Sequence, residues 1–381
     1  MRDIEKSGVA ETKSNPNQTS NRKLDHIRIC LEEEVESDYS GLEEIKFVNN
    51  PLPELDFNDI TTEVVFLGKK LSAPFLIASM TGGHPDTTEI NRNLAVAVEE
   101  SGIGMGVGSQ RAALEDRGLE KLELEELERS FTVVREFAPN AFIYANIGLP
   151  QILQHGIEYA EKAVEMIDAD AIAIHLNFMQ EVIQPEGDVN ARNGLKAIRE
   201  VTESLKVPVI VKETGGGVAA FVAEKIRDIG ADAIDVGGAG GTSWIGVEVY
   251  RTEDEISKKI GYEFWDWGLP TAFSIVECRN YLPLIATGGI RSGLDVAKSI
   301  AIGAEIGSAA LPFLSPATRS SDEVLKLIEF FIRGLKIAMF LTGCRKIKEL
   351  RNRQLIVHGR FKDYLEVKGI DVQKFCRNRE V

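Results

Sequence analysis

Eight compact apolar runs recur along the chain, and each is followed by a Gly-rich or polar loop and then by a helical pattern. None of the runs alternates between apolar and polar residues, which is typical of strands buried on both faces of a parallel sheet. Eight βα units of this kind favour an α/β fold of the (β/α)8 TIM-barrel type. A doubly wound open sheet remains the alternative, because periodicity alone does not show closure. The runs are FLIAS, IGMGV, FIYANI, AIAIHL, VPVIVK, DAIDV, LPLIAT and AEIGSAA.

Segments at both ends add to this barrel. Residues 1–20 are polar with almost nothing large and apolar, so we expect a disordered tail, with residues 21–381 forming a single TIM-barrel catalytic domain. The N-terminal extension contains EEIKFVNN and TTEVVFLGKKL, which predict short strands. A helical segment is predicted from about residue 321 to a C-terminal cap at Gly343.

The charge balance limits the partners. Lys and Arg number 44 against 59 Asp and Glu, for a formal net charge of -15, so the overall field disfavours nucleic acid and anionic membranes. An anionic ligand must therefore be held by a local basic cluster. The four cysteines contain no CxxC pair, which argues against a zinc site and a disulfide framework and fits a reducing cytoplasm. No apolar stretch approaches the roughly 18 residues of a membrane span, so we expect a cytoplasmic protein.

The stretch HLNFMQEVIQPEGD begins where the fourth apolar run ends. His175 and Asn177 alternate on the predicted strand, so they share one face and project toward the barrel mouth. Gln180 and Glu181 follow in the loop. Polar residues at strand C-termini form the active site of a TIM barrel, although solvated loop residues would give the same composition.

Later strand ends indicate a phosphate site. GGIRSG follows the seventh run and GSAAL the eighth, the two loops that carry phosphate in phosphate-binding barrels. The loop GGAGGTSW is rich in backbone N–H groups that can approach an anion. Lys212 is predicted either to place a cation beside a cofactor or to pair with Glu213. A monophosphate held there leaves room for a flat ring, lined by ASMTGG, Ser109 and Asn146, which makes FMN the candidate cofactor.

Seven ordered motifs extend from RKLDH at residues 22–26 through ASMTGG, GSQRAALED, HLNxxQExxQPEGD, VKExGxG, GGTSW with WDWGLPT, and GGIRSGLD. Together they resemble type 2, FMN-dependent isopentenyl diphosphate isomerase. The resemblance implies interconversion of isopentenyl and dimethylallyl diphosphate without net redox change. It also implies reduced FMN as acid/base cofactor, Mg²⁺, NAD(P)H as reductant, and a homo-oligomer, a tetramer or an octamer.

The same resemblance assigns roles to individual residues. A diphosphate-binding set, a catalytic set and a single carboxylate ligand for Mg²⁺ surround the flavin. Gly237 departs from the pattern, because relatives carry a hydroxyl residue there that helps to hold FMN. The substrate-binding residues are Arg22, Lys23, His26, Ser109, Gln110, Arg111 and Gln180, the catalytic residues are His175, Asn177, Gln180, Trp244 and Glu248, and the metal ligand is Glu181. The cofactor-binding residues are Ala78, Ser79, Met80, Thr81, Ser109, Asn146, Lys212, Thr242, Gly289, Ile290, Arg291, Ala310 and Leu311.

Two other functions remain open. A flavin-dependent 2-hydroxy-acid oxidase would share the barrel and its phosphate loops, but it needs a His base beside Arg residues, and HGR at 358–360 falls beyond those loops. A non-catalytic sensor of flavin or isoprenoid diphosphate would not need Gln180, Glu181 and Lys212, whose presence argues against it.

Overall fold

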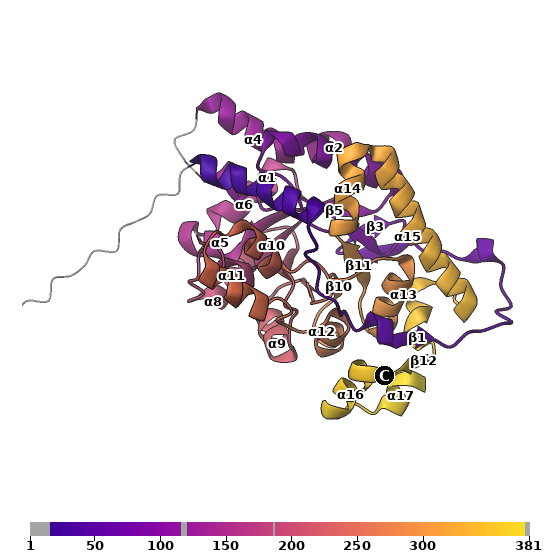
Figure 1. The fold of residues 1–381 in the computed structure, drawn as a ribbon. Helices are drawn as coiled ribbons and strands as arrows, with labels where there is room; N and C mark the ends of the chain where they lie inside the picture. Colours follow the sequence, from indigo (N-terminus) through magenta and orange to yellow (C-terminus); the bar gives the residue numbers. More distant parts are fainter. Residues whose placement is uncertain (1–15, 116–119, 186, 378–381) are drawn as a thin grey trace, which may run out of the picture.

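A closed barrel of eight parallel strands forms the centre of the computed structural model, which describes residues 16–115, 120–185 and 187–377 (Figure 1). Each apolar run of the sequence contributes one strand, and β11 pairs with β4 to close the sheet. The predicted TIM barrel is therefore confirmed, and the doubly wound alternative is wrong. The strands are β4 (Phe75–Ile77), β5 (Gly104–Gly106), β6 (Phe142–Gly148), β7 (Ala171–Leu176), β8 (Val209–Glu213), β9 (Ala233–Asp235), β10 (Leu284–Ala286) and β11 (Ile306–Ala309).

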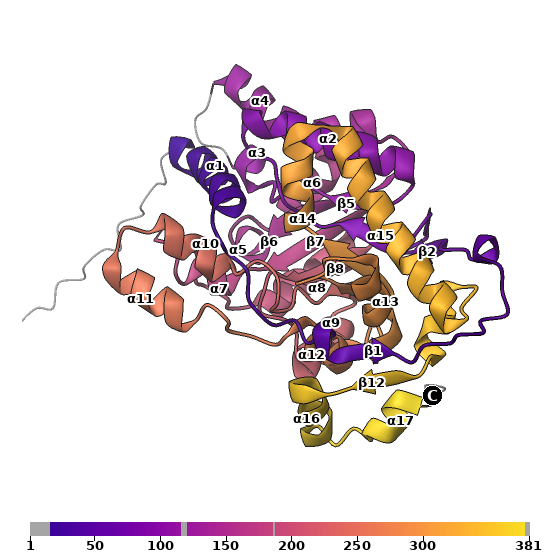
Figure 2. The ribbon, with the colours of Figure 1, turned by 45° about the vertical axis from the view of Figure 1, so that its right-hand side comes forward.

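Helices after each strand form the outer layer of the barrel (Figures 1 and 2). Several βα connections hold more than one helix, and the short ones lie directly after the strand, where they border the barrel mouth. In chain order these are α2 (Thr88–Ser101), α3 (Arg111–Leu114), α4 (Lys121–Phe137), α5 (Leu149–His155), α6 (Glu158–Met166), α7 (Phe178–Glu181), α8 (Gly194–Ser204), α9 (Ala220–Asp228), α10 (Trp244–Arg251), α11 (Glu255–Glu263), α12 (Thr271–Cys278), α13 (Gly293–Ile302), α14 (Leu311–Arg319) and α15 (Ser321–Thr342).

The strands are buried on both faces, as their non-alternating composition predicts. All seven residues of β6 are buried. Alternate residues nevertheless belong to different cores: Phe142 and Tyr144 pack inside the barrel, while Ile143 packs with the outer helices. Side chains therefore alternate between the inside and the outside of the barrel, although the hydropathy of the strand does not alternate.

The predicted N-terminal strands are present. β2 (Val64–Phe66) and β3 (Lys69–Leu71) form an antiparallel hairpin. Phe66 joins the inner core of the barrel, with its ring centroid 6.0 Å from that of Phe142. The strand β1 (Ile45–Phe47) pairs with β12 (Leu355–Val357), which ties the extension to the C-terminal helices α16 (Gly359–Val367) and α17 (Val372–Arg377).

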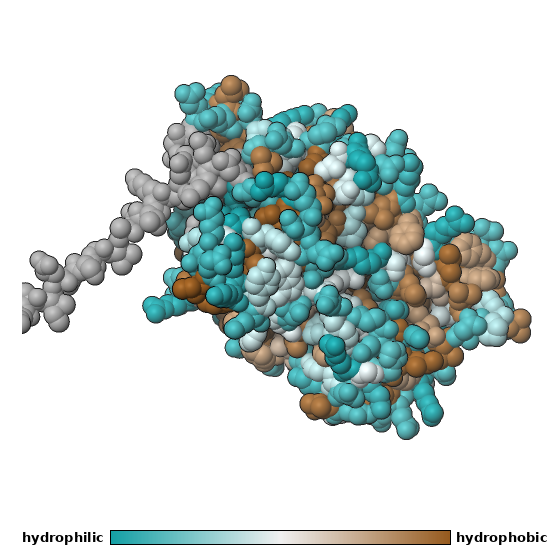
Figure 3. Space-filling view, viewed as in Figure 1, coloured by the Kyte–Doolittle hydropathy of each residue, from teal (hydrophilic) through white to brown (hydrophobic). Residues whose placement is uncertain are grey.

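The predicted C-terminal helix is α15. Ser320 caps its start by accepting a hydrogen bond from the Glu323 N–H, and Gly343 ends it with a φ of 70° in the left-handed region. Hydrophobic side chains gather on the surface over this helix (Figure 3), and Phe330, Ile337 and Leu341 are the exposed apolar residues of α15.

The N-terminal extension crosses the barrel mouth. Helix α1 (Pro16–Glu32) packs on α10 and α14, and the chain then runs past the barrel to β1 (Figure 2). Backbone hydrogen bonds from the Ser37 N–H to Gly241 and from the Ser243 N–H to Val35 fasten this segment. Of the predicted disordered tail, residues 1–15 lie outside the described part of the chain. Residues 16–20 instead start α1, where Pro16 is suited to a first helical position.

None of the described helices combines the length and the apolar character that a membrane crossing requires. None of the four cysteines, Cys30, Cys278, Cys344 and Cys376, forms a disulfide bond with another described residue.

Candidate functional site

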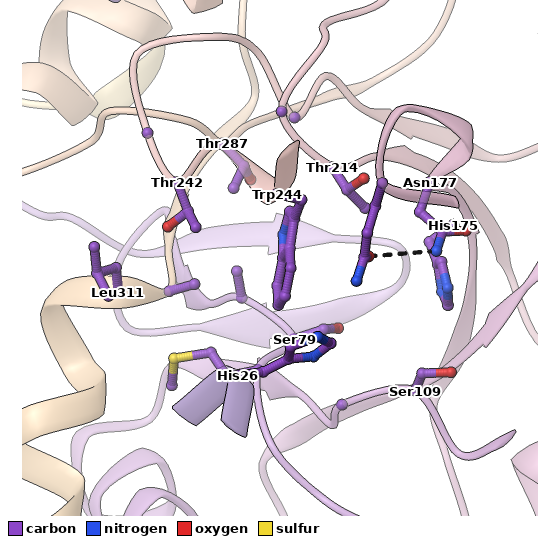
Figure 4. A pocket seen from close by; sticks show the side chains of 18 of the residues that line it. His26, Ser79, Ser109, His175, Asn177, Thr214, Thr242, Trp244, Thr287 and Leu311 are labelled. Carbon is purple, nitrogen blue, oxygen red and sulfur yellow. Dashed lines mark hydrogen bonds between the residues drawn. The ribbon is translucent and has the colours of Figure 1, made fainter. Parts of the chain in front are cut away.

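A large cavity opens at the C-terminal ends of the barrel strands, with α1 as its roof. Its volume is about 1530 Å³, counting the solvent at its mouth. Side chains from β7, α1, α10 and the loop after β4 converge on it (Figure 4).

Nearly all of the residues predicted from the sequence line this cavity. All thirteen predicted cofactor-binding residues line it, and so does the predicted metal ligand Glu181. Six of the seven predicted substrate-binding residues do so, and four of the five predicted catalytic residues, with Gln180 belonging to both sets. The two exceptions are Gln110 and Glu248. These segments lie far apart in the sequence, and the barrel brings them to one end.

Gln110 corrects the sequence analysis. Its side chain is fully buried and turned away from the cavity, because its Oε1 accepts from the Asn146 N–H at 3.0 Å and its Nε2 donates to the Ala163 carbonyl at 2.8 Å. Arg111, the next residue, begins α3 and faces the cavity. Gln110 is therefore a support for Asn146 and not a substrate ligand.

The phosphate loops are built for close backbone approach. Gly288 and Gly289 follow β10 with φ values of 106° and 70°. A Cβ on Gly241 would lie 2.7 Å from the Gly289 backbone nitrogen, so the two glycine loops pack more closely than a side chain would allow. The start of α14 lies opposite, where the first N–H groups of a helix have no partner within it. This cradle fits a phosphate group.

Two polar groups on the floor of the cavity also fit a bound cofactor. The Thr287 Oγ1 and the Ser79 Oγ are buried and have no hydrogen-bond partner among the described residues. Both residues line the cavity (Figure 4). Buried polar groups are normally satisfied, so these atoms are suited to a ligand.

Lys212 lines the same cavity, and its ion-pair partner differs from the predicted one. Its Nζ contacts the Asp235 Oδ2 at 2.7 Å, and both residues are buried at paired positions of β8 and β9. Glu213 is engaged elsewhere, since its Oε2 accepts from the N–H groups of Gly215 and Gly216. The predicted Lys212–Glu213 pair is therefore wrong, whereas the predicted cation at the cavity wall is present.

His175 is held as a neutral ring with a defined tautomer. Burial, together with the nearby cations Lys23, Lys212 and Arg111, lowers the pKa of His175 to about 3. The Asn146 Nδ2 donates to the Val107 carbonyl, so its Oδ1 faces the His175 Nδ1 at 2.9 Å. An amide oxygen only accepts, so the Nδ1 of His175 carries the proton and Nε2 keeps its lone pair.

Glu181 is the predicted metal ligand, and its carboxylate is fixed on both sides. Its Oε1 accepts from the Asn177 Nδ2 and its Oε2 from the Asp188 N–H, each at 2.7 Å. Among the residues that the structure describes, no group of three His, Cys, Asp or Glu side chains is placed to hold a metal. One carboxylate supplemented by phosphate oxygens and waters suits Mg²⁺, so Glu181 fits that ion.

Glu248 lies behind the cavity wall, so the predicted catalytic role cannot involve direct contact with a ligand in this arrangement. It is fully buried, and its carboxylate accepts hydrogen bonds from the His26 Nε2 at 2.9 Å, the Gln180 Nε2 at 2.8 Å and the Arg251 Nε at 2.6 Å. Burial favours the neutral acid, but these donors prevail and lower the pKa of Glu248 to about 2. Glu248 is therefore ionised and orients its neighbours.

The roof helix joins this network. Burial lowers the pKa of His26, so its ring is neutral and donates from Nε2 to Glu248. The ring also meets Trp244 edge-on, with centroids 5.3 Å apart (Figure 4). His26 and Glu248 are 222 residues apart in the sequence, and their contact holds α1 over the mouth.

Several polar residues of the cavity were not predicted from the sequence. Gln151, Gln184, Thr214 and Thr287 line it without having been singled out. Gln184 belongs to the quoted QPEGD stretch and Thr287 directly precedes GGIRSG, so motif position could have identified both. Gln151 follows β6 on α5 and had no such signal.

The chain is similar in sequence to an FMN-dependent protein family and to isopentenyl-diphosphate delta-isomerases over most of its length. The model of the FMN-dependent dehydrogenase family matches residues 140–357. The isopentenyl-diphosphate delta-isomerase of Archaeoglobus fulgidus is 63% identical over 351 residues, which cover 92% of this chain and 99% of that protein. The protein of the same name from Methanosarcina mazei is 51% identical over 362 residues, which cover 94% of this chain and 97% of that one.

Solved structures share the fold. A mandelate oxidase variant with an FMN adduct has a TM-score of 0.60 at 18% identity and covers 91% of this chain and 100% of its own. A flavocytochrome b2 variant with sulfite bound has a TM-score of 0.61 at 16% identity, with coverages of 86% and 81%. Such low identities support the fold alone, whereas the sequence relatives identify the family. The chain belongs to the type 2, FMN-dependent family of isopentenyl diphosphate isomerases.

Proposed function

We propose that this protein interconverts isopentenyl diphosphate and dimethylallyl diphosphate with reduced FMN and Mg²⁺. One observation carries the proposal: the cavity offers two separate places for phosphate groups. Backbone loops at Gly288–Gly289 and the start of α14 form one. The other is lined by Arg22, Lys23 and Arg111. The first suits the monophosphate of FMN, and the second suits a diphosphate substrate.

The basic side chains matter because the whole protein is acidic, with a net charge of -15. After burial, the charges of Lys23, Lys212 and Arg111 contribute to the lowered pKa of His175, so positive charge converges at this place. A local cationic field captures an anionic substrate despite the overall charge. Arg22 and Arg111 supply forked donors that match phosphate oxygens.

The residues around the cofactor divide into holding and orienting groups. Ser79, Asn146, Thr242 and the phosphate loops would hold FMN, with Lys212 beside its ring. Reduced FMN supplies a ring that can give a proton to the alkene and take one back. Trp244 contributes an aromatic face that stabilises positive charge developing on the hydrocarbon.

Proton positions at the site follow from the hydrogen bonds. The Nε2 of His175 keeps a lone pair and can accept a hydrogen bond from the substrate side. Gln180 does not titrate near neutrality, and ionised Glu248 fixes its amide by accepting from Nε2. Gln180 therefore orients substrate or water. Glu181 would hold Mg²⁺ together with diphosphate oxygens.

A 2-hydroxy-acid oxidase is the second candidate, because the solved structures with this fold include a mandelate oxidase. The HGR segment argues against it. His358 is exposed beyond β12 and does not line the cavity. His175 does lie near Arg111 in the cavity, but burial and the nearby cations lower its pKa to about 3, which makes it a weak base for such an oxidase. A non-catalytic sensor would not require the hydrogen-bonded side chains that surround Gln180.

An anaerobic assay tests the proposal. Purified protein with FMN, Mg²⁺, NADPH and isopentenyl diphosphate should form dimethylallyl diphosphate, and turnover should require reduced flavin. Equal turnover with oxidised flavin would refute the cofactor's acid/base role. Glu181→Gln should lower activity and weaken the Mg²⁺ requirement while the flavin spectrum stays unchanged, and Glu165→Gln on the exposed side of α6 is the matched control.

The proposal also covers the reductant of the flavin, the cellular location and the oligomeric state. NAD(P)H is proposed as the source of electrons for the flavin. The lack of a disulfide among the described cysteines fits a reducing compartment, so the cytoplasm is the proposed location. A homo-oligomer, tetrameric or octameric, is proposed from family membership, and light scattering of the holoenzyme tests it.

A further inference from the structure

Gln184 is a buried amide in the cavity wall with only half of its hydrogen-bonding capacity in use. It is 5% exposed and lines the cavity. Its N–H lies one helical turn beyond Gln180, with the backbone nitrogen 3.0 Å from the Gln180 carbonyl, so the two side chains share a face. Its Nε2 has no hydrogen-bond partner among the described residues.

The orientation of this amide follows from a chain of hydrogen bonds. Glu248 is ionised, and a carboxylate only accepts, so the NH₂ group of Gln180 must face it at 2.8 Å. The second hydrogen of the same NH₂ group points to the Gln184 Oε1 at 3.4 Å. Because the oxygen of Gln184 is turned toward Gln180, its NH₂ group is turned the other way. Glu248 thus fixes the direction of an amide that it does not touch.

A buried donor without a partner is costly, which points to a ligand atom. Leaving such a group unsatisfied costs about 1–3 kcal/mol. The missing partner must be an acceptor. A metal-bound water presents its hydrogens and a hydrocarbon tail offers no lone pair, whereas a phosphate oxygen accepts strongly. The metal-bound water suits the Asn177 Oδ1 instead, which is a buried acceptor without a described partner beside Glu181.

We propose that Gln184 is a substrate-binding residue whose Nε2 donates a hydrogen bond to an oxygen of the bound diphosphate, while its Oε1 accepts from Gln180. The inference rests on the proposed function, because the diphosphate is the substrate named there. It adds a neutral donor beside Glu181, where a further cation would pair with the carboxylate that holds the metal. Through Gln180 it also couples diphosphate binding to the residue that orients the reacting group.

Two substitutions separate the donor from the rest of the side chain. Gln184→Met keeps the length and removes both polar atoms. Gln184→Glu keeps an acceptor for Gln180 but removes the N–H donor. Gln154→Met, on the exposed side of α5, is the matched control. The probe is inorganic pyrophosphate with Mg²⁺, titrated calorimetrically into holoenzyme with oxidised FMN, so that binding is measured without turnover.

The expected result is a loss of pyrophosphate affinity of about tenfold to a hundredfold in both Gln184 variants, the size of a lost hydrogen bond to a charged group. FMN affinity and the flavin spectrum should not change, and Gln154→Met should match the wild type. Wild-type affinity in both Gln184 variants overturns the inference. Weakened flavin binding with unchanged pyrophosphate affinity also overturns it, since the partner would then be the cofactor.

The same titration separates this inference from the proposed function. If the wild type binds pyrophosphate through Gln184 but does not isomerise isopentenyl diphosphate, the function is wrong and the contact stands. If the wild type isomerises the substrate and the Gln184 variants bind pyrophosphate normally, the function stands and the contact is wrong. A wild type that does not bind pyrophosphate with Mg²⁺ overturns the inference.

Discussion

Glu248→Gln tests how much the buried carboxylate stabilises the roof of the cavity. Glu248 is fully buried and accepts from His26, Gln180 and Arg251. Its pKa falls from 4.5 to about 2. At about 1.36 kcal/mol per unit this corresponds to about 3 kcal/mol of stability at pH 7. We take that as an upper figure, because His26 is neutral and contributes a hydrogen bond more than a charge.

The sign of the pH dependence follows from the lowered pKa. A carboxyl group whose folded pKa lies below its unfolded value stabilises the fold fully above the unfolded pKa and loses that contribution as the pH falls through the folded one. The window for Glu248 therefore runs from 4.5 down to about 2. Glutamine mimics the protonated acid, so the wild type and the variant should converge in stability on acidification.

Urea unfolding of holoenzyme checks both the size and the sign. The free energy of unfolding of Glu248→Gln should be lower by about 2–3 kcal/mol at pH 7, and the gap should shrink to about 2 kcal/mol or less near pH 3.5. Glu253→Gln, an exposed neighbour, is the control and should show no gap. A difference below about 1 kcal/mol at pH 7, or one that grows with acid, refutes the reasoning.

Three further substitutions test other parts of the site. Lys23→Ala should raise the KM for isopentenyl diphosphate and leave FMN affinity unchanged, and the two titrations check this; an unchanged KM would remove the residue from the diphosphate site. Asp235→Ala should lower the free energy of unfolding by about 3–5 kcal/mol, because it leaves the buried Lys212 cation unpaired. Chemical denaturation measures this change, and a variant as stable as the wild type would contradict the prediction. Gly237→Ser should destabilise the protein and lower its flavin content, since a Cβ there lies 2.0 Å from the Glu213 carbonyl at a φ of +43°; a stable, flavin-loaded variant would contradict this.

The backbone at Gly237 explains why this position departs from the family pattern. The family resemblance leads us to expect a hydroxyl residue at this position that helps to hold FMN. Here the left-handed φ of +43° and the close Glu213 carbonyl leave no space for a side chain. The unpartnered Thr287 Oγ1 at the same cavity is a nearby hydroxyl that can serve a ligand instead.

The composition of the strands indicated eight buried parallel strands, and only the pairing of β11 with β4 showed that they close into a barrel. Runs such as FIYANI and AIAIHL are apolar at all but one position because parallel barrel strands are buried on both faces, and this local property can be read without knowing the neighbouring strands. The end of each run then located the site, since the carboxyl ends of barrel strands meet at one end. His175 and Asn177 were found in this way.

The tertiary structure alone decided which side chains meet and which way they point. Gln110 and Arg111 are adjacent in one motif, yet only Arg111 reaches the cavity, because α3 begins between them. Lys212 pairs with Asp235 on the neighbouring strand and not with Glu213, since consecutive residues of one strand point to opposite faces of the sheet. The direction of the Gln184 amide depends on Glu248 through Gln180, contacts that span 68 residues. Periodicity reports whether a position is buried, and only the packing of distant segments reports its partner.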